Sequence, residues 1–151
     1  MSASASSDSP ISGVTLTALK IFEGAMGNVM HGLRSDDDVY HGFGEAYFST
    51  VNPGVIKSWR RHKEATLNLI VPQGEIRFVV CDDRGEWEAV FWEVNLSLEN
   101  YQRLTVAPGL WLAFQGVSSG TNMLLDIIDL PHDPAESEAK ALDEIPYDWG
   151  R

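Results

Sequence analysis

From residue 55 onward, the chain alternates between short apolar or β-branched runs and turn-forming sequences. The runs cover residues 55–62, 66–71, 76–81, 89–96, 101–106, 110–115 and 122–130. Pro72-Gln73-Gly74 and Ala107-Pro108-Gly109 are two of the turns that separate them. Strands at this spacing, with no helical periodicity between them, predict an all-β protein, either an antiparallel sandwich or a barrel.

The two ends of the chain depart from this regular pattern. Residues 1–12 begin with a Ser/Ala-rich sequence that lacks the features of a secretory signal, so we expect a flexible tail. Further short strands are expected at residues 15–22, 29–33 and 45–51. Good helix formers fill residues 135–142, which predicts a short C-terminal helix. Residues 13–151 are expected to form a single domain.

The charge balance limits the possible partners. The chain has 22 acidic residues against 11 Lys and Arg, and its formal net charge is −11. Nucleic acids and anionic membranes require a basic surface, so we expect neither as a general partner, although a local basic cluster can hold a small anion. The single cysteine, Cys81, excludes an intramolecular disulfide. No apolar segment approaches the ~18 residues of a membrane span, and we expect a cytoplasmic protein.

The residues Gly54, Arg60, His62, Leu67 and Gly74 stand at a spacing that resembles the first cupin motif. In that motif, Gly is followed by a His-x-His pair, then by a Glu, and finally by a second Gly. Two residues separated by one neighbour point to the same face of a strand, so both motif histidines reach the barrel interior. The spacing therefore predicts a cupin barrel, which is a jelly roll or double-stranded β-helix.

The metal-binding positions of the cupin motifs are almost completely replaced. Arg60 occupies the first His position, and Leu67 occupies the Glu position. In the second cupin motif a His follows a Pro/Gly turn, and here that position is Leu112. One imidazole beside a guanidinium and two leucines cannot hold a divalent cation. We therefore expect no metal and no cofactor, with His62 acting as a hydrogen-bonding group.

The wider sequence is similar to the dTDP-4-dehydrorhamnose 3,5-epimerase family of cupins. The similarity is carried by residues 54–60, 73–80, 82–84, 96–100 and 104–114 and by the ending Ile145-Pro146-Tyr147-Asp148-Trp149. It covers about residues 15–149. This resemblance implies a homodimer that epimerises a nucleotide-linked 4-keto-6-deoxyhexose at C3 and C5. It also implies that a His–Asp pair acts as the base, a Tyr acts as the acid, and basic residues hold the diphosphate and the enolate.

The family's catalytic positions are matched unevenly in this chain. The catalytic His falls on Arg60, which stays protonated and is therefore a poor base. The acid that partners this His falls near Glu144, so we expect an Arg60–Glu144 ion pair. The catalytic Tyr falls around Pro131-His132. The candidate catalytic residues are therefore His62, on the same strand face as the lost His, together with His132 and Glu144.

A basic cluster surrounds His62. Lys57, Arg60, Arg61 and Lys63 are four of the chain's 11 Lys and Arg. One interpretation is an anion site at the barrel mouth for a diphosphate or an enolate. The other is that Arg61 and Lys63 face solvent while Arg60 pairs internally. Neighbouring tryptophans could stack on a base or sugar, or could serve only in packing. The candidate substrate-binding residues are Lys57, Trp59, Arg60, Asn68 and Trp111.

Three functions remain open at this point. An isomerase or epimerase of a nucleotide-linked 4-keto-6-deoxysugar, in deoxysugar or polysaccharide biosynthesis, agrees with the resemblance and the basic cluster. A cupin that binds a nucleotide sugar or another anion without turnover agrees with the loss of the base. A structural subunit with a packed interior would place Leu67, Leu69 and Leu112 inward. A homodimer is expected in all three cases.

Overall fold

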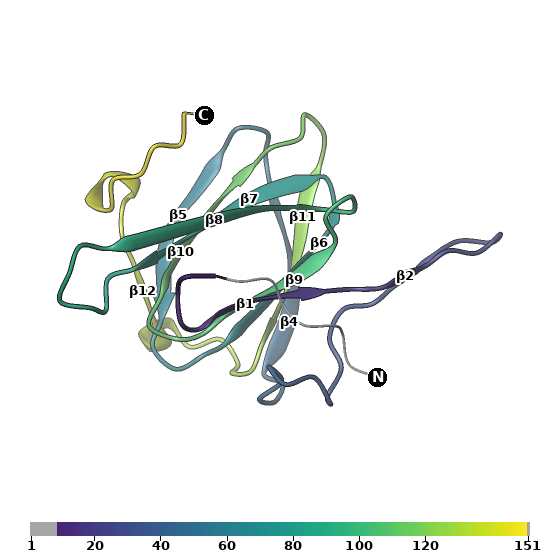
Figure 1. The fold of residues 1–151 in the computed structure, drawn as a ribbon, viewed down its shortest axis with the longest axis horizontal. Coiled ribbons are helices and arrows are strands. Elements are labelled where there is room, and N and C mark those ends of the chain that lie inside the picture. The colour runs from purple at the N-terminus through teal and green to yellow at the C-terminus, as the bar shows by residue number, and fades with distance from the viewer. Residues whose placement is uncertain (1–8, 151) are drawn as a thin grey trace.

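Two antiparallel five-stranded sheets face each other in the computed structural model, which describes residues 9–150. In spatial order, the first sheet contains β1 (Val14–Ala18), β9 (Gln102–Val106), β6 (Leu67–Gln73), β11 (Asn122–Ile128) and β4 (Glu45–Val51). The second contains β12 (Ser137–Ala139), β5 (Ile56–His62), β10 (Trp111–Gly116), β7 (Glu75–Asp82) and β8 (Val90–Ser97). Figure 1 shows the two layers and the path of the chain between them.

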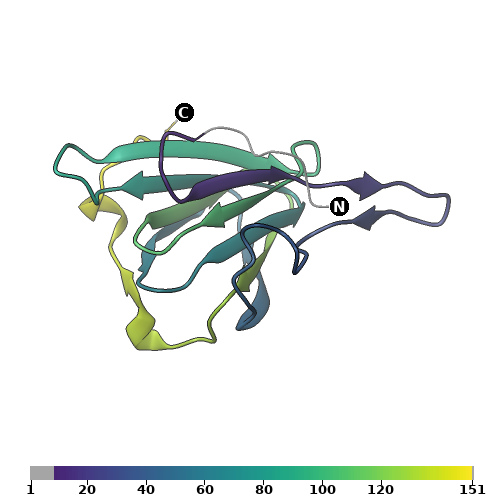
Figure 2. The same ribbon diagram turned by 60° about the horizontal axis from the view of Figure 1, so that its bottom comes forward.

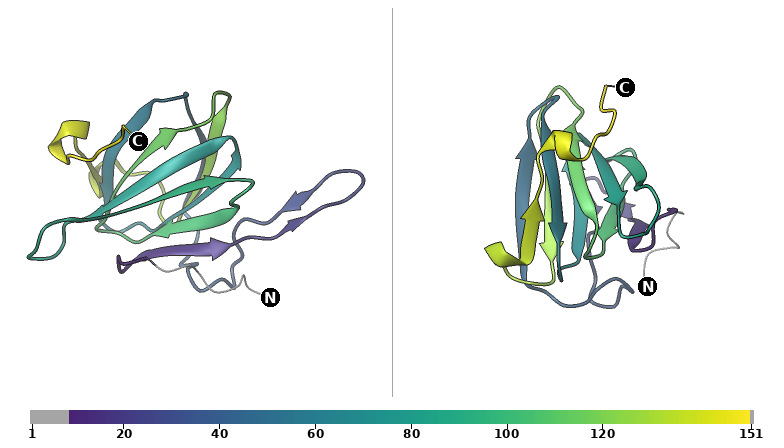
Figure 3. Two further views of the ribbon diagram at one scale, coloured as in Figure 1. Left: turned by 45° about the horizontal axis from the view of Figure 1, so that its top comes forward. Right: turned by 90° about the vertical axis from the view of Figure 1, so that its left-hand side faces the viewer.

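The chain crosses between the sheets at almost every step, which produces the jelly-roll arrangement. From β4 to β7 and again from β8 to β12, successive strands lie in opposite sheets. The right-hand view of Figure 3 shows the two layers side by side. A hairpin arm of β2 (Ile21–Phe22) and β3 (Val29–Met30) extends away from both sheets (Figures 1 and 2). The predicted all-β cupin barrel is confirmed.

Strand β7 illustrates why the second sheet lies between two apolar layers. Ile76, Phe78 and Val80 belong to the inner core between the sheets. Val79 and Cys81 point the other way, into a separate outer cluster. A strand that is buried on both faces reads as a nearly continuous apolar run, which is the pattern of residues 76–81.

The C-terminal segment covers this outer cluster. Ile145 is buried there, and Tyr147 and Trp149 pack against it. The indole of Trp59 donates a hydrogen bond from Nε1 to the carbonyl oxygen of Ile145 at 3.1 Å. The last part of the chain therefore closes the outer face of the second sheet.

The predicted C-terminal helix at residues 135–142 is wrong. The segment contains a 3-10 turn, η1 (Pro134–Glu136), then β12, then the start of a second 3-10 turn, η2 (Leu142–Glu144). Strand β12 pairs with β5 and places Ser137 opposite His62. A helix this short is marginal in water, whereas the open edge of β5 offers backbone hydrogen bonds. Tertiary pairing therefore overrides the local helix propensity.

The second motif glycine forms the tight turn that its spacing predicts. Gly74 joins β6 to β7 with a φ of 76°, in the left-handed region. A Cβ at this position would lie 2.3 Å from the carbonyl oxygen of Thr121, so a side chain does not fit. The fully buried side chain of Asn122 closes the turn, since it accepts from the Glu75 N–H at 3.0 Å and donates to the Val51 carbonyl at 3.2 Å.

The folded domain begins before residue 13. Most of the predicted flexible tail, residues 1–8, lies outside the described residues. Ile11, however, is only 2% exposed, and Arg84 donates from Nη2 to the carbonyl oxygen of Ser12 at 2.7 Å. Within residues 9–150, no helix has the length and apolar character needed to cross a membrane.

Candidate active site

An open cavity of about 410 Å³ lies between the two sheets. Strands β4, β6 and β11 supply one wall, and β5 and β10 supply the other. Its apolar lining includes Leu67, Leu69, Leu112, Phe114 and Leu124. A second hollow of about 360 Å³ adjoins it and shares the side chains of Tyr47, Arg60 and His62. Sites for small molecules commonly have volumes of ~300–1,000 Å³, so the cavity is large enough for one.

A β-bulge in β5 brings Lys57, Arg60 and His62 to the same wall of the cavity. Leu112 on β10 is opposite Arg60, whereas Phe114 is opposite Lys57, so β5 contains one extra residue between these pairs. Without the bulge, the odd separation of Lys57 and Arg60 would send them to opposite faces. Lys57 instead crosses the cavity, and its Nζ donates to Ser49 Oγ on β4 at 2.9 Å.

His62 forms a tight pair with Glu136 in this wall. The Nδ1 atom of His62 lies 2.6 Å from Glu136 Oε1, and the two side chains are only 16% and 12% exposed. The other carboxylate oxygen of Glu136 accepts the backbone N–H groups of Glu64 and Ala65 at 2.9 and 2.8 Å. An ionised Glu136 fixes the orientation of the imidazole ring and leaves its Nε2 available to a ligand.

The electrostatics of Glu136 favour its ionised form. Burial opposes the negative charge, but the N–H groups of Glu64 and Ala65 and the hydrogen bond to His62 hold the pKa of Glu136 below its ordinary value. Donors that bind the charged form of a carboxyl group stabilise that form. Glu136 is therefore a permanent acceptor for the Nδ1–H of His62 at neutral pH.

The expected Arg60–Glu144 ion pair is not formed. Arg60 instead donates from Nη1 to Ser137 Oγ at 3.0 Å, because β12 occupies the edge of β5. Glu144 Oε1 accepts the backbone N–H of Ala141 at 2.8 Å and so serves the η2 turn. The carboxylate that partners His62 is that of Glu136, which comes earlier in the chain than the predicted Glu144.

Two cations of the basic cluster belong to the cavity. In the described part of the chain, neither Lys57 nor Arg60 has a carboxylate partner, and both side chains are exposed to the open cavity. Lys63 is exposed, and its Nζ donates to the carbonyl oxygen of Ala135 at 3.1 Å. Of the four cluster residues, Lys57 and Arg60 line the cavity, whereas Arg61 and Lys63 are bound elsewhere.

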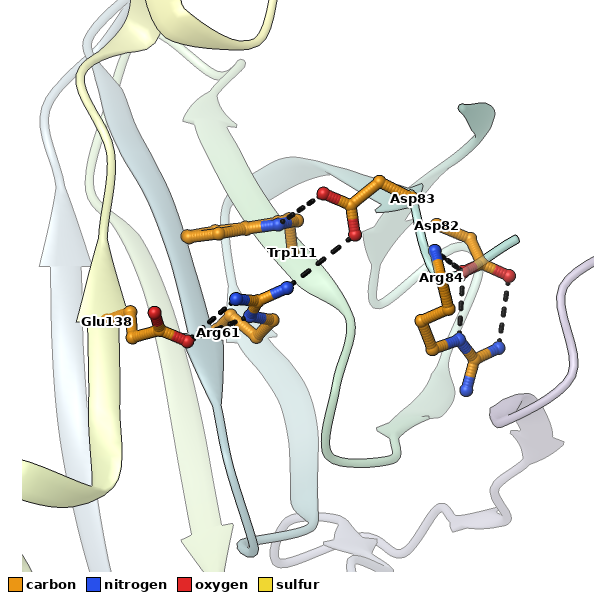
Figure 4. Close-up of polar contacts among 6 residues, drawn as sticks. All are labelled: Arg61, Asp82, Asp83, Arg84, Trp111 and Glu138. Atoms are coloured by element: carbon orange, nitrogen blue, oxygen red, sulfur yellow. Dashed lines mark hydrogen bonds and ion pairs between the residues drawn. The ribbon is translucent and has the colours of Figure 1, made fainter. Parts of the chain in front are cut away.

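Arg61 and Trp111 lie on the outer face of the second sheet, as Figure 4 shows. Arg61 donates from Nη2 to Glu138 Oε2 at 2.8 Å and lies 3.6 Å from Asp83. The Nε1 atom of Trp111 donates to Asp83 at 3.1 Å, and the guanidinium of Arg61 stacks 4.6 Å from the centre of the indole. Trp111, a predicted substrate-binding residue, therefore packs on the outside of the barrel and not in its cavity.

Trp59 and Asn68 also direct their polar groups away from the cavity. Trp59 borders the cavity, but its indole is 1% exposed and belongs to the outer cluster. Asn68 lies between Leu67 and Leu69, which line the cavity, so strand alternation turns it to the opposite face. There its Oδ1 accepts a hydrogen bond from Thr105 Oγ1 at 2.7 Å. Neither predicted substrate-binding residue presents a polar group to the cavity.

His132 occupies an exposed position at the edge of the site. It borders the adjoining hollow together with His62 and Glu136. It lies on the segment between β11 and η1, where Pro131 precedes it and Asp133 follows. His132 is therefore near the mouth of the site, but on a different segment from the oriented pair.

The four cupin ligand positions converge as the motif spacing predicts. Arg60, His62, Leu67 and Leu112 all line the same cavity. A leucine supplies no donor atom and a guanidinium supplies none either, so this set does not fit a metal ion. Among residues 9–150, no group of three or more His, Cys, Asp or Glu is placed to hold one.

A second polar pair lines the opposite wall. The hydroxyl of Tyr47 on β4 donates to Asp126 Oδ2 on β11 at 3.1 Å. Asp126 is only 4% exposed, and burial raises its pKa to about 7, with a smaller contribution from the charge of Glu45, although the bond from Tyr47 acts the other way. Burial and the charge of Asp126 also raise the pKa of Tyr47 above its ordinary value.

Tyr47, Asp126 and Glu136, which form the two polar pairs of the site with His62, were not predicted from the sequence. Glu136 lies in the segment that was interpreted as a helix, so its placement depends on the pairing of β12 with β5. Asp126 could have been found from the sequence, because it is an acid in the middle of the apolar run 122–130. Acidic side chains are rarely fully buried, and a buried one requires an explanation.

Comparison with known proteins places this cavity in context. No family model matches the chain. The structure superposes on a dTDP sugar isomerase from Desulfovibrio desulfuricans G20 with a TM-score of 0.87, at 32% identity, covering 93% of this chain and 92% of that one. The sequence is 29% identical over 140 residues to the probable low-salt glycan biosynthesis epimerase Agl13 of Haloferax volcanii, covering 89% of this chain and 87% of that protein.

More distant structures share the fold. The dTDP-4-dehydrorhamnose 3,5-epimerase of Sulfolobus tokodaii superposes with a TM-score of 0.79 at 19% identity, covering 93% of this chain and 84% of that one. The fold is that of a cupin, and the relative at 32% identity places it with the sugar-nucleotide isomerases and epimerases. The chain belongs to the dTDP-4-dehydrorhamnose 3,5-epimerase-like family, which confirms the resemblance seen in the sequence.

Proposed function

We propose that the chain is a metal-independent isomerase or epimerase of a nucleotide-linked 4-keto-6-deoxysugar in deoxysugar or polysaccharide biosynthesis. The observation that carries the proposal is the His62–Glu136 pair in the wall of the cavity. An imidazole oriented by a carboxylate is an effective general base near neutral pH. In this proposal His62 takes over the role of base from the position that Arg60 now occupies.

The proposed reaction begins with proton abstraction beside the ketone. The Nε2 atom of His62 takes the proton from the carbon next to the carbonyl group, and Glu136 stabilises the resulting imidazolium through Nδ1–H. The electron pair moves to the ketone oxygen, where a cation from Lys57 or Arg60 offsets the developing negative charge. The cation that does not face the enolate is available to the diphosphate.

The relatives support this class of substrate. One is named a dTDP sugar isomerase, and another is named a glycan biosynthesis epimerase. Two structures with the same fold hold dTDP-quinovose and dTDP-4-keto-L-rhamnose. Together with Lys57 and Arg60, which have no carboxylate partner among the described residues, these relatives support a nucleotide sugar as the ligand.

Deuterium exchange tests the proposed base. The wild-type protein, incubated with dTDP-4-keto-6-deoxyglucose in deuterated water, is expected to introduce deuterium next to the ketone. His62→Ala is expected to reduce the exchange rate by about 10²–10⁴-fold, because the base is removed. NMR or mass spectrometry measures the label, and His41→Ala, in an exposed loop, is the control. Full exchange by His62→Ala would rule out His62 as the base.

A non-catalytic cupin that binds a nucleotide sugar or another anion is the second candidate. The observation in its favour is Arg60, which stands at the base position of the family and cannot accept a proton. In that case dTDP raises the melting temperature of the wild-type protein, while no deuterium enters the sugar. Melting and exchange measured on the same sample distinguish the two functions.

We also propose that the chain acts as a homodimer in the cytoplasm. Support for a dimer comes from large apolar side chains on the arm, where Phe22, Met26 and Val29 are 52%, 103% and 61% exposed. Apolar side chains gathered on an extended arm are typical of a surface that a partner covers. Light scattering on the purified protein measures the mass, and a monomeric mass would contradict this proposal.

A further inference from the structure

The cavity contains a second proton-bearing pair that the proposed base does not use. Tyr47 and Asp126 are register partners on the neighbouring strands β4 and β11, so their side chains leave the sheet on the same face. Tyr47 is 43% exposed, and its ring borders both the cavity and the adjoining hollow. Asp126 lies beneath it and is almost fully buried. The phenol is therefore the accessible end of the pair, and the carboxyl group is the buried end.

Within residues 9–150, the buried end has no cationic partner to stabilise a negative charge. Asp126 forms no ion pair with any described residue, and its Oδ1 atom has no hydrogen-bond partner among them. The other charged or titratable groups around the cavity and its adjoining hollow are Glu45 on β4, Lys57, Arg60 and His62 on β5, and His132, Asp133, Glu136 and Lys140 in the C-terminal segment.

This environment makes Asp126 a carboxyl group that holds a proton near neutral pH. Burial is the main cause, and the nearby charge of Glu45 acts in the same direction. A buried carboxyl group with an unsatisfied oxygen costs stability, and such groups concentrate at functional sites. The position of Asp126 behind an accessible phenol, in the wall facing His62, points to proton transfer.

We propose that Tyr47 delivers the second proton of the reaction and that Asp126 is the buried source which restores it. The inference rests on the proposed function, because it needs the enolate that His62 generates. Tyr47 contacts the substrate and is therefore a catalytic residue. Asp126 acts through the tyrosine hydroxyl as its proton source.

The protons balance without any further reactant. His62 gains the proton of the first C–H bond, and the carbon–hydrogen electron pair becomes the enolate. The enolate carbon forms a new C–H bond with the Tyr47 hydroxyl proton, which leaves a phenolate. The carboxyl group of Asp126, turned so that its protonated oxygen faces Tyr47, then transfers that proton to the phenolate across the 3.1 Å between the two oxygens. After product release, His62 loses a proton to solvent and Asp126 regains one.

The placement on two walls determines the stereochemical outcome. His62 is on β5 of the second sheet, whereas Tyr47 is on β4 of the first, and the cavity lies between these sheets. A proton removed on one face of the sugar carbon and delivered on the other inverts the configuration. A single base would return the proton to the face from which it came. The two walls therefore assign inversion at carbon, which is epimerisation, to this site.

Asp126→Asn and Tyr47→Phe separate the two proton transfers. The variants are assayed in deuterated water with dTDP-4-keto-6-deoxyglucose. Both are expected to retain deuterium exchange into the recovered substrate at a rate within about threefold of wild type, because His62 still removes the proton. Formation of the inverted product is expected to fall by about 10²–10⁴-fold, the usual contribution of a general acid. Asp38→Asn, an exposed aspartate outside the cavity, is the matched control and should keep both rates.

The outcomes discriminate between the inference and the function on which it rests. Retained exchange with lost inversion supports the proton relay. Equal loss of both rates in Tyr47→Phe, which removes one accessible hydroxyl group, would overturn the relay and indicate a binding role. Undiminished inversion in both variants would also overturn it, while leaving His62 as the base. A wild-type protein without any exchange would overturn the proposed function itself.

Discussion

At the scale of single residues, the site keeps the geometry of a cupin and changes its chemistry. Arg60 and His62 still point into the cavity, and leucines stand where two metal ligands would be. Two polar pairs of the cavity include residues outside the motif, because Glu136 binds His62 and Asp126 accepts a hydrogen bond from Tyr47. Each of these acids is bound differently, so their protonation states differ at the same pH.

The buried Asp126 predicts a pH-dependent stability. Its native pKa of about 7 lies above the ordinary value of 3.8, so the native state keeps a proton that the unfolded chain has already lost. Its contribution to the free energy of unfolding therefore falls as pH rises from about 4 to about 7. Asp126→Asn removes this cost, and its stabilisation should be about 2–3 kcal/mol greater at pH 8 than at pH 5.

Urea unfolding at the two pH values measures this difference. Asp38→Asn provides the comparison, because that side chain is exposed and its replacement should shift both values equally. A stabilisation by Asp126→Asn that is the same at pH 5 and pH 8 would show that Asp126 ionises normally in the folded protein.

At the scale of elements, β5 and the segment that pairs with it assemble the side of the site that holds the proposed base. The bulge in β5 selects which side chains enter the cavity, and η1 with β12 supplies the carboxylate beside them. From the sequence, an acid of this segment was predicted as the partner, but the predicted residue was Glu144 and not Glu136. Predicting Glu136 as the partner requires the knowledge that β12 pairs with β5, and local propensity does not reveal that pairing.

Paired substitutions distinguish the two glutamates. Glu136→Gln replaces a carboxylate that binds His62 and two backbone N–H groups, so exchange should fall by about 10–10³-fold, since the imidazolium loses its counter-charge. Glu144→Gln keeps an oxygen for the Ala141 N–H and should leave exchange unchanged. Both rates are measured by the same deuterium assay, and an equal loss in the two variants would contradict the assignment of Glu136.

The turn between β6 and β7 depends on one buried amide. Asn122 bonds to Glu75, Val51 and the Ser118 backbone, and no part of it is exposed. Asn122→Ala leaves these buried groups without partners and should lower the free energy of unfolding by about 2–4 kcal/mol. Denaturant titration measures the loss. Asn100→Ala, at an exposed turn, should cost under about 1 kcal/mol, and similar losses in both would contradict this role.

At the scale of the whole molecule, the fold was predictable because short apolar runs and glycine turns recur throughout the chain. The spacing from Gly54 to Gly74 located the inner strand faces, so Arg60, His62, Leu67 and Leu112 were placed correctly in one cavity. Trp59, Asn68 and Trp111 were not, because strand alternation and the bulge decide which face each one takes. Contacts between distant strands, such as Tyr47 with Asp126, leave no pattern in the sequence.

The pairing of the C-terminal segment with β5 also sets the order in which the site is completed. Residues after β11 add only the edge strand β12 to the second sheet, but they provide Glu136 and cover the outer cluster. During synthesis, the two walls of the barrel leave the ribosome before the carboxylate that orients His62. Under the proposed function, His62 therefore becomes an oriented base only once this segment has paired with β5.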